Sequence, residues 1–261
     1  MRQSLLYHRH AMSTYEVVIL AALFFCVAIP YTTVGHAGAS GYIAAMALIG
    51  VAPEVMRPTA LALNILIAAF TAYRFRQASY FSWSGLWPFL AGSVPFAALG
   101  GAQKLSHGGY YAAVGVVLLL SALYLTWRAL NTLALASDET VRVRKLPAVF
   151  IGAAIGLLAG LTGTGGGIFL SPTILFLGWA GPKSTAGISA PFILVNSIVA
   201  LAAGSFTVQV LPAELPLFAA SALAGGVVGT WLGLQRLRQR HLLLTLAVVM
   251  ALAAFKLLLI A

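Results

Sequence analysis

Two glycine-rich segments are the places in this sequence where the backbone itself could bind a ligand. Residues 35–41 read Gly-His-Ala-Gly-Ala-Ser-Gly, and residues 162–167 read Thr-Gly-Thr-Gly-Gly-Gly. Each glycine costs about 1 kcal/mol in a helix interior relative to alanine, so this density predicts an interrupted helix. Broken helices direct free N–H groups and positive dipole ends inward, where they favour a bound anion. Small Gly, Ser and Thr side chains let that anion reach the backbone.

Other kinds of site chemistry lack their usual residues. The acidic residues Glu16, Glu54, Asp138, Glu139 and Glu214 lie at the ends of apolar runs or in a central polar stretch. The sequence contains no Walker loop, HExxH motif or nucleophile elbow. Its histidines give no pair at metal-ligand spacing within an apolar run. We therefore expect no enzyme activity, no metal and no cofactor, and the missing ATP-binding motif favours a secondary carrier.

The elements that must hold these segments lie in a membrane. The chain has 261 residues, of which 61% are hydrophobic and 8% charged, with a net charge of +10. A soluble domain carries roughly 25% charged residues, so this composition excludes a soluble protein. The basic residues occupy short breaks between apolar runs, as in cytoplasmic loops of membrane proteins, rather than forming a nucleic-acid-binding patch. The sequence predicts an all-α integral membrane protein that contacts lipids.

Two of the uncharged runs are too long to be single spans. One membrane-spanning helix needs about 20 residues, and most of the runs hold one such helix. Val17–Pro53 and Leu146–Pro182 are each nearly twice that length, and each contains one of the glycine-rich segments. Irregular backbone at membrane depth persists only where protein or a watery cavity shields it. Each run is therefore expected to fold as two shorter helices around a break.

The chain also reads as a duplicated unit. Arg57-Pro58-Thr59-Ala60 resembles Lys183-Ser184-Thr185-Ala186, which lies about half the chain length further on. We expect a first repeat over residues 14–131, a basic linker over 132–145 and a second repeat over 146–261. Each repeat has about five hydrophobic segments, two short ones around the break and three longer ones. An odd number of segments predicts that the two repeats have inverted topology, as in many secondary transporters.

Basic residues orient this topology in the membrane. The connections on the side of the central linker carry more of them than the other side does. They are Arg74, Arg76, Arg128, Arg142, Arg144, Lys145, Lys183, Arg236, Arg238 and Arg240, against Arg2, Arg9, Arg57 and Lys104. The positive-inside rule then places the linker in the cytoplasm and both termini outside.

Several polar residues allow two interpretations each. Arg57 and Lys183 precede helix starts and could attract an anion or simply anchor the helix at the membrane surface. His36 could bind a ligand or carry a proton, or it could be a buried histidine bonded to backbone. Asn64 and Asn196 lie within spans, where such amides more often join helices than bind substrate.

The second half resembles a known family of transporters. Residues 160–172, Gly-Leu-Thr-Gly-Thr-Gly-Gly-Gly-Ile-Phe-Leu-Ser-Pro, resemble the signature of the TauE/SafE sulfite-exporter family, and residues 183–189 resemble the Thr/Ser-containing helix that follows it. This resemblance implies export of sulfite, a sulfonate or a related small organic anion across the bacterial inner membrane. The first half departs from the pattern, since His36, Ala37, Ala39 and Ser40 stand where further glycines would be expected.

The predicted site lies between the two breaks. Its expected lining residues are His36, Gly38, Ser40, Thr59, Thr162, Gly163, Thr164, Gly165, Gly166, Thr185 and Ser189, with Arg57 and Lys183 attracting the anion. Alternating access would rock one repeat against the other. Two alternatives are an intramembrane enzyme acting on a small or lipid substrate and a membrane scaffold without transport activity. The sequence leaves the anion, the coupling ion and the oligomeric state open.

Overall fold

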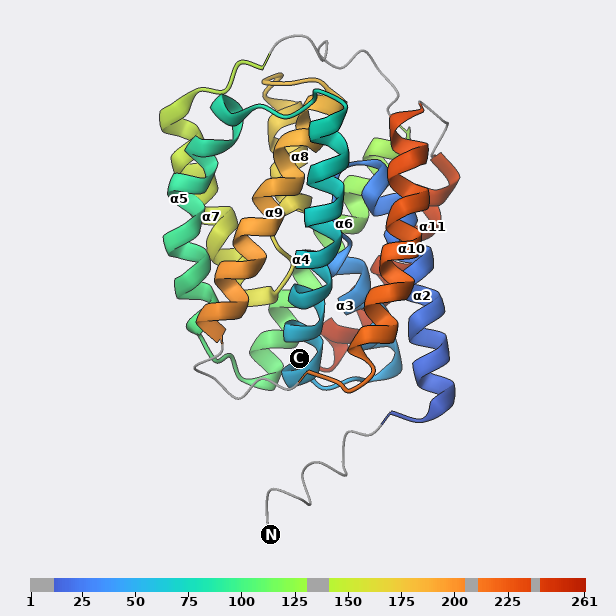
Figure 1. The fold of residues 1–261 in the computed structure, drawn as a ribbon. Coiled ribbons are helices and arrows are strands. Elements are labelled where there is room, and N and C mark those ends of the chain that lie inside the picture. Colours follow the sequence, from blue (N-terminus) through green and yellow to red (C-terminus); the bar gives the residue numbers. More distant parts are fainter. Residues whose placement is uncertain (1–11, 131–140, 205–210, 236–239) are drawn as a thin grey trace.

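Ten α-helices account for most of the described chain (Figure 1). The structure is a computed structural model that describes residues 12–130, 141–204, 211–235 and 240–261. The helices are α2 (Thr14–Thr33), α3 (Ala39–Ile49), α4 (Pro53–Gln77), α5 (Trp83–Ala102), α6 (His107–Leu130), α7 (Lys145–Thr162), α8 (Gly167–Phe176), α9 (Pro182–Gly204), α10 (Leu215–Leu234) and α11 (Arg240–Leu259).

Local sequence explains several of the helix ends. Ser13 and Glu16 form a capping box at the start of α2, with the Ser13 N–H donating to Glu16 Oε2 at 2.8 Å. Pro53 occupies the first turn of α4, where its missing N–H costs nothing. Gly50 ends α3 with a left-handed φ of 91°. Gly50 and Pro53 thus make the connection between α3 and α4 short, and it lies at the lower end of the bundle in Figure 1.

The helices pair across the two halves of the chain. Two helices of the first half, α5 and α2, pack against α7 and α10 of the second half, respectively. The remaining long helices pair α4 with α9 and α6 with α11. Each helix of the first half has a counterpart five places later in the chain, so that α2 corresponds to α7 and α5 to α10. Replacing every helix by its counterpart turns the α5–α7 pair into the α10–α2 pair and leaves the other two pairs unchanged. Neither half therefore forms a separate bundle.

Glycines allow the α5–α7 and α2–α10 pairs to approach closely. Such small residues let helix backbones meet in membranes, where hydrophobicity drives no helix association. A Cβ atom on any of these glycines would collide with a backbone carbonyl of the facing helix. On α7 they are Gly152, Gly156 and Gly160, facing Phe89, Ser93 and Ala97 of α5; on α10 they are Gly225, Gly229 and Gly233, facing Phe25, Ile29 and Thr33 of α2.

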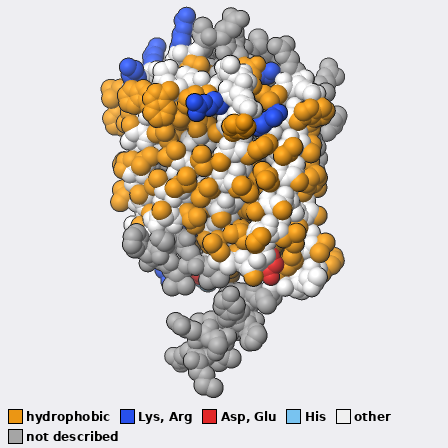
Figure 2. All heavy atoms as spheres, in the orientation of Figure 1, with side chains coloured by type: hydrophobic (Ala, Val, Ile, Leu, Met, Phe, Trp, Pro, Cys, Tyr) orange, Lys and Arg blue, Asp and Glu red, His pale blue; other side chains and the backbone are white. Residues whose placement is uncertain are grey.

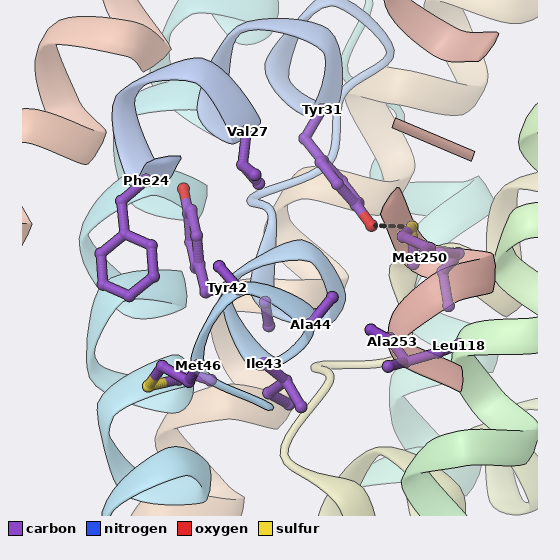
Figure 3. Close-up of a cluster of buried hydrophobic side chains, with 14 of the residues drawn as sticks. Phe24, Val27, Tyr31, Tyr42, Ile43, Ala44, Met46, Leu118, Met250 and Ala253 are labelled. Atoms are coloured by element: carbon purple, nitrogen blue, oxygen red, sulfur yellow. Dashed lines mark hydrogen bonds between the residues drawn. The ribbon is translucent and has the colours of Figure 1, made fainter. Parts of the chain in front are cut away.

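Buried apolar side chains form two clusters rather than one. The larger cluster draws on α2, α3, α4, α6, α10 and α11, with Ile168 of α8 and Ile193 of α9, and includes Phe24, Tyr42 and Leu118 (Figure 3). Phe24 meets Tyr42 edge-on, with ring centroids 5.0 Å apart. The smaller cluster draws on α5, α7, α8 and α9, and includes Phe89 and Phe192. Each cluster thus contains helices from both halves of the sequence.

The outer surface suits a lipid environment. Seven helices of the described chain are long and apolar enough to cross a membrane: α2, α4, α5, α6, α7, α9 and α10. The shorter apolar helices are α3, α8 and the part of α11 from Met250 to Leu259. Figure 2 shows hydrophobic side chains over the middle of the visible face, with Lys and Arg side chains gathered at its upper end. The expectation of an all-helical, multi-spanning membrane protein is confirmed.

Charges are unequal between the two ends of the bundle. Arg76 lies in the last turn of α4, at the upper end of the bundle. The start of α7 lies at the same end, where Lys145 begins the helix and Arg142 and Arg144 precede it, all three exposed. The described acidic residues belong to the other end, since Glu16 and Glu54 lie in the first turns of α2 and α4, and Glu214 precedes α10. Arg2, Arg9, Arg236, Arg238 and most of the predicted linker lie outside the described residues. The inverted repeats and the repeat boundaries stay predictions.

Candidate functional site

Both long apolar runs fold as a helix, a break and a shorter helix, as expected. The first break covers residues 34–38 and the second covers residues 163–166. Positive φ angles of 80° at Gly35 and 104° at Gly38 shape the first break, and angles of 80°, 72° and 80° at Gly163, Gly165 and Gly166 shape the second. These angles favour glycine because they bring a Cβ atom into steric conflict. Ser40 and Thr162, predicted to lie in the breaks, are instead helical.

Each break is buried against a helix from the other half. All residues from 30 to 47 and from 162 to 168 are buried, and Figure 1 shows both connections inside the bundle rather than at its ends. A Cβ atom on Gly35 would overlap Ala186 of α9, and one on Gly163 would lie 2.9 Å from Arg57 Cγ of α4. Ala186 and Arg57 both lie near the start of their helices. The two breaks therefore pack in matching ways on α9 and α4.

Asn64 of α4 joins the two breaks directly. Its Oδ1 accepts a hydrogen bond from the backbone N–H of Ala39, the first residue of α3, at 3.1 Å. Its Nδ2 donates to the carbonyl of Thr164 in the second break at 3.3 Å and to Ser197 Oγ of α9 at 3.3 Å. The side chain is 1% exposed. Asn64 thus acts as the helix-joining amide that was one of its two interpretations.

His36 begins a second chain of hydrogen bonds between the halves. Its Nε2 lies 2.6 Å from Ser171 Oγ of α8, and Ser171 Oγ lies 2.8 Å from Ser189 Oγ of α9. All three side chains are at most 2% exposed. The Nδ1 atom of His36 is buried without a hydrogen-bond partner. The predicted residues His36 and Ser189 therefore come together, through a serine that the sequence analysis did not single out.

The hydroxyl groups predicted to line the site differ in how they are used. Thr162 Oγ1 donates to the Leu158 carbonyl at 2.7 Å and lies 3.0 Å from Thr164 Oγ1. Ser40 Oγ lies 2.6 Å from the hydroxyl of Tyr31. The Tyr31 hydroxyl also donates to Met250 Sδ at 3.0 Å (Figure 3). Thr59 Oγ1 is buried without a partner.

The Thr185 hydroxyl is only weakly bound to its surroundings, whereas the position of Gly38 leaves no room for a side chain. Thr185 Oγ1 makes a long contact of 3.5 Å with the Ala180 carbonyl. A Cβ atom on Gly38 would lie 2.7 Å from the Tyr42 ring, so the ring requires a glycine there as the φ angle does. Gly165 is restricted in the same way, because its Cβ atom would run into the Asn64 amide. These glycines serve the joint between the breaks as well as any ligand.

Arg57 and Lys183 lie near the starts of α4 and α9, and their side chains contact the C-terminal ends of the matching helices α5 and α10. Arg57 donates to the carbonyls of Gly100, Gly101 and Gln103 at the end of α5, and to Gly160 of α7, over 2.6–3.0 Å. Lys183 donates to the carbonyl of Leu234 at the end of α10, at 3.3 Å. A cation there is stabilised by the negative end of the helix dipole. This geometry favours a helix-capping role for both residues over attraction of a passing anion.

Partners in this region that the sequence analysis missed include Ser171, Ser197 and Lys256, as well as Tyr31 and Tyr110, which contact Ser40 and the Thr162 carbonyl, respectively. Lys256 of α11 donates to the Ala47 and Leu48 carbonyls near the end of α3, each at 2.9 Å. Ser171 lies four residues after Gly167 and therefore on the same face of α8, which is the signal that could have singled it out. Ser197 and Lys256 had no comparable signal, because their partners come from the other half of the chain.

The polar groups of the two breaks suit a small anion better than a metal ion. They offer hydroxyls, backbone N–H groups, an amide and one imidazole. Within the described ranges, no three His, Cys, Asp or Glu side chains come together. Paired broken helices buried in a multi-spanning helical protein are a feature of secondary transporters. The fold and the site thus define the class of a membrane transporter.

Comparison with known proteins identifies the family. Residues 20–257 match the family described as "Sulfite exporter TauE/SafE". A relative from Sinorhizobium fredii (strain NBRC 101917 / NGR234), named "Probable membrane transporter protein y4hK", is 38% identical over 247 residues, covering 93% of this chain and 98% of the relative. No solved structure gives a significant match. The chain belongs to the TauE/SafE family of membrane transporters, as the glycine-rich motif indicated.

Proposed function

We propose that this protein is a secondary transporter that exports sulfite, a sulfonate or a related small anion, bound between its two helix breaks. The observation behind this proposal is the joint at Asn64, which holds the start of α3 and the carbonyl of Thr164 together inside the bundle. A ligand between the breaks would contact helices of both halves. Binding there could therefore favour one arrangement of those helices over another.

The binding groups in this proposal come mainly from the second break and the helices beside it. The first turn of a helix leaves backbone donors free. At the start of α8 these are the N–H groups of Gly167 and Ile168, since the N–H of Phe169 already donates to the Gly166 carbonyl. Thr164, Thr59 and Thr185 add hydroxyl groups, and His36 adds an imidazole. Together they would replace part of the water that a small anion loses, which is the main cost of its entry into the protein.

We also propose that the halves are inverted repeats with the central linker in the cytoplasm. The exchange of helix pairs between halves, described above, supports a twofold relation. In Figure 1 the start of α2 and the end of α11 lie at one end of the bundle, and the end of α6 and start of α7 at the other. The basic residues at that second end favour the cytoplasm. A bacterial inner-membrane location follows from the family resemblance.

The proposal is tested by anion flux in proteoliposomes. Purified protein should move radiolabelled sulfite or a sulfonate faster than protein-free vesicles do, and a monocarboxylate of similar size more slowly. Thr164→Val should raise the half-saturation concentration about 5- to 30-fold, because one hydrogen bond to a charged group contributes about 1–2 kcal/mol. Thr126→Val is the matched control, since that hydroxyl donates to Ala122 within α6.

The outcomes separate a transporter from the alternatives. Normal sulfite flux with Thr164→Val would move the site away from the second break. Absence of flux for every anion, in protein that is inserted and folded, would overturn the proposed function.

A further inference from the structure

One of the two ring nitrogens of His36 has a hydrogen-bond partner, and the other has none. Nε2 and the adjacent Cδ2 face α8: Nε2 contacts Ser171, and Cδ2 lies 3.5 Å from the position of a Cβ atom on Gly167. Nδ1 lies on the opposite edge of the ring, buried and without a partner. If Nε2–H donates to Ser171, and Ser171 donates to Ser189, Nδ1 presents a free lone pair. The ring can then gain a proton at Nδ1 without breaking any of these hydrogen bonds.

A proton on His36 would have no counter-ion among the described residues that contact it. The polar neighbours of the ring are Ser171 of α8, which contacts Nε2 and in turn contacts Ser189 of α9, and the Tyr31 ring of α2, whose centroid lies 6.2 Å from that of the imidazole. Arg128 of α6 also acts on the imidazole through space, and its charge has the same sign as that of an imidazolium. A buried charge without a partner is costly, so an imidazolium there needs an anion from outside the protein.

We propose that the transported anion is that counter-ion, and that its binding is coupled to uptake of one proton at His36. This inference rests on the proposed function and deepens it by naming the group that balances the charge of the bound anion. One N–H bond forms at Nδ1 when the anion binds, and the same bond breaks when the anion leaves. The anion then occupies the site as part of a neutral ion pair. Because linkage is reciprocal, the proton favours the anion as much as the anion favours the proton.

Ser171 and Ser189 are positioning residues in this scheme. They hold the Nε2 edge of the ring, so that Nδ1 is the nitrogen that takes and releases the proton. Removing the Ser171 hydroxyl leaves an imidazolium with one N–H unpaired in a buried place, which weakens its protonation. Ser171→Ala should therefore shift anion binding to lower pH. A purely structural role for the serine would change affinity equally at every pH.

Proton uptake can be measured directly by calorimetry. Sulfite itself titrates, so the probe is methanesulfonate, whose charge is constant near neutral pH, with sulfite as a second ligand. Titrations of the intact protein in detergent, in two buffers of different ionisation enthalpy, report the protons taken up per anion bound. The wild type should take up a proton, and its affinity should fall with rising pH towards a limit of about tenfold per pH unit.

His36→Gln should bind methanesulfonate without proton uptake, and with an affinity that does not change with pH. Ser121→Ala is the matched control for Ser171→Ala, because Ser121 is also a buried serine, and its hydroxyl donates to the Val117 carbonyl within α6. If His36→Gln does not insert, Ser171→Ala supplies the test through its shift of the pH profile.

The results distinguish this inference from the proposed function. Anion binding with the same proton uptake in wild type and His36→Gln, or with none in either, would overturn the role of His36 and leave the anion site standing. Failure of both binding and flux in the wild type, for sulfite and for methanesulfonate, would overturn the proposed function and this inference with it.

Discussion

Asn64 combines two hydrogen-bonding functions that few side chains offer together. An amide presents a carbonyl oxygen to the Ala39 N–H and an NH₂ group to the Thr164 carbonyl, so one residue satisfies a free donor and a free acceptor. An aspartate would offer acceptors alone. The sequence showed a polar residue within an apolar run, which predicts helix joining. It could not show the partners, because one lies at the start of α3 and the other in the second break, both distant from Asn64 along the chain.

Asn64→Ala should destabilise the protein and stop transport. The Ala39 N–H and the Thr164 carbonyl would be left buried and unpaired, at a cost of about 1–3 kcal/mol each. The free energy of unfolding should fall by about 2–4 kcal/mol, which thermal unfolding in detergent would detect as a lower midpoint. Thr71→Val, on the same helix, is the control, because the Thr71 hydroxyl is buried without a partner. Equal midpoints for Asn64→Ala and wild type would contradict the joint.

Arg57 is expected to act on stability rather than on anion entry. Its guanidinium is 8% exposed, and it donates to four backbone carbonyls of α5, the turn that follows it and α7. Arg57→Gln should reduce the free energy of unfolding by about 2–3 kcal/mol, because hydrogen bonds from a charged donor are lost. Arg57→Lys should recover part of this loss, since an ammonium group has three donors and no planar fork.

Vesicles with sulfite offered from one side at a time separate the two roles of Arg57. Helix capping predicts the same fractional loss of flux from either side, with little dependence on ionic strength, because buried charges are weakly screened. A raised half-saturation concentration from one side alone, relieved by salt, would instead support anion attraction.

At the scale of helices, the glycines of α7 and α10 decide how closely the two halves approach. Their four-residue spacing places them on one face of each helix, against a carbonyl row of the partner. The glycine-rich breaks were predictable, because several glycines within six or seven residues disfavour a continuous helix. The partners of α7 and α10 were not, since the same spacing would serve any neighbouring helix. Only the fold shows that α7 meets α5 and α10 meets α2.

Two adjacent glycines of α10 give a matched comparison. A Cβ atom on Gly225 would overlap the Phe25 carbonyl of α2, whereas one on Gly226 has its nearest neighbours at 3.6 Å, an ordinary contact. Gly225→Ala should separate the helices and reduce the free energy of unfolding by about 1–3 kcal/mol. Gly226→Ala should be neutral or stabilising by up to about 1 kcal/mol, because alanine favours the helix. The thermal midpoint of Gly225→Ala should therefore lie below that of the wild type, and the midpoint of Gly226→Ala should lie at or above it. A lower midpoint for Gly226→Ala alone would contradict this packing.

At the scale of the whole molecule, the exchange of partners changes the expected moving parts. The sequence suggested one repeat rocking against the other. The two hydrophobic clusters, however, each mix helices of both halves. The smaller one draws on α5, α7, α8 and α9, and the larger one draws on α2, α4 and α10 among others, together with Ile168 of α8 and Ile193 of α9. Asn64 and Ser197 form one hydrogen bond between α4 and α9. Two groups of helices, each drawn from both halves and meeting at α4, α8 and α9, fit this packing better than two intact repeats.

Topology is tested with reporter fusions. A fusion within residues 131–145 should report cytoplasm, and a fusion after Ala261 should report periplasm. The reason is that five segments follow the linker, and that basic residues gather at the linker end of the bundle. Both fusions reporting the same compartment would contradict inverted repeats. Fusions reporting the reverse arrangement would contradict the orientation alone.

The pairing of α2 with α10 also has a consequence for biosynthesis. The ribosome completes α2 well before it makes α10, yet the backbone of α2 fits closely against the glycine face of that late helix. During synthesis α2 must wait in the membrane with this face against lipid or a chaperone. Assembly of the first half is thus incomplete until nearly the whole chain has been inserted. A ribosome that stops after α6 would leave a fragment suited to recognition by membrane proteases.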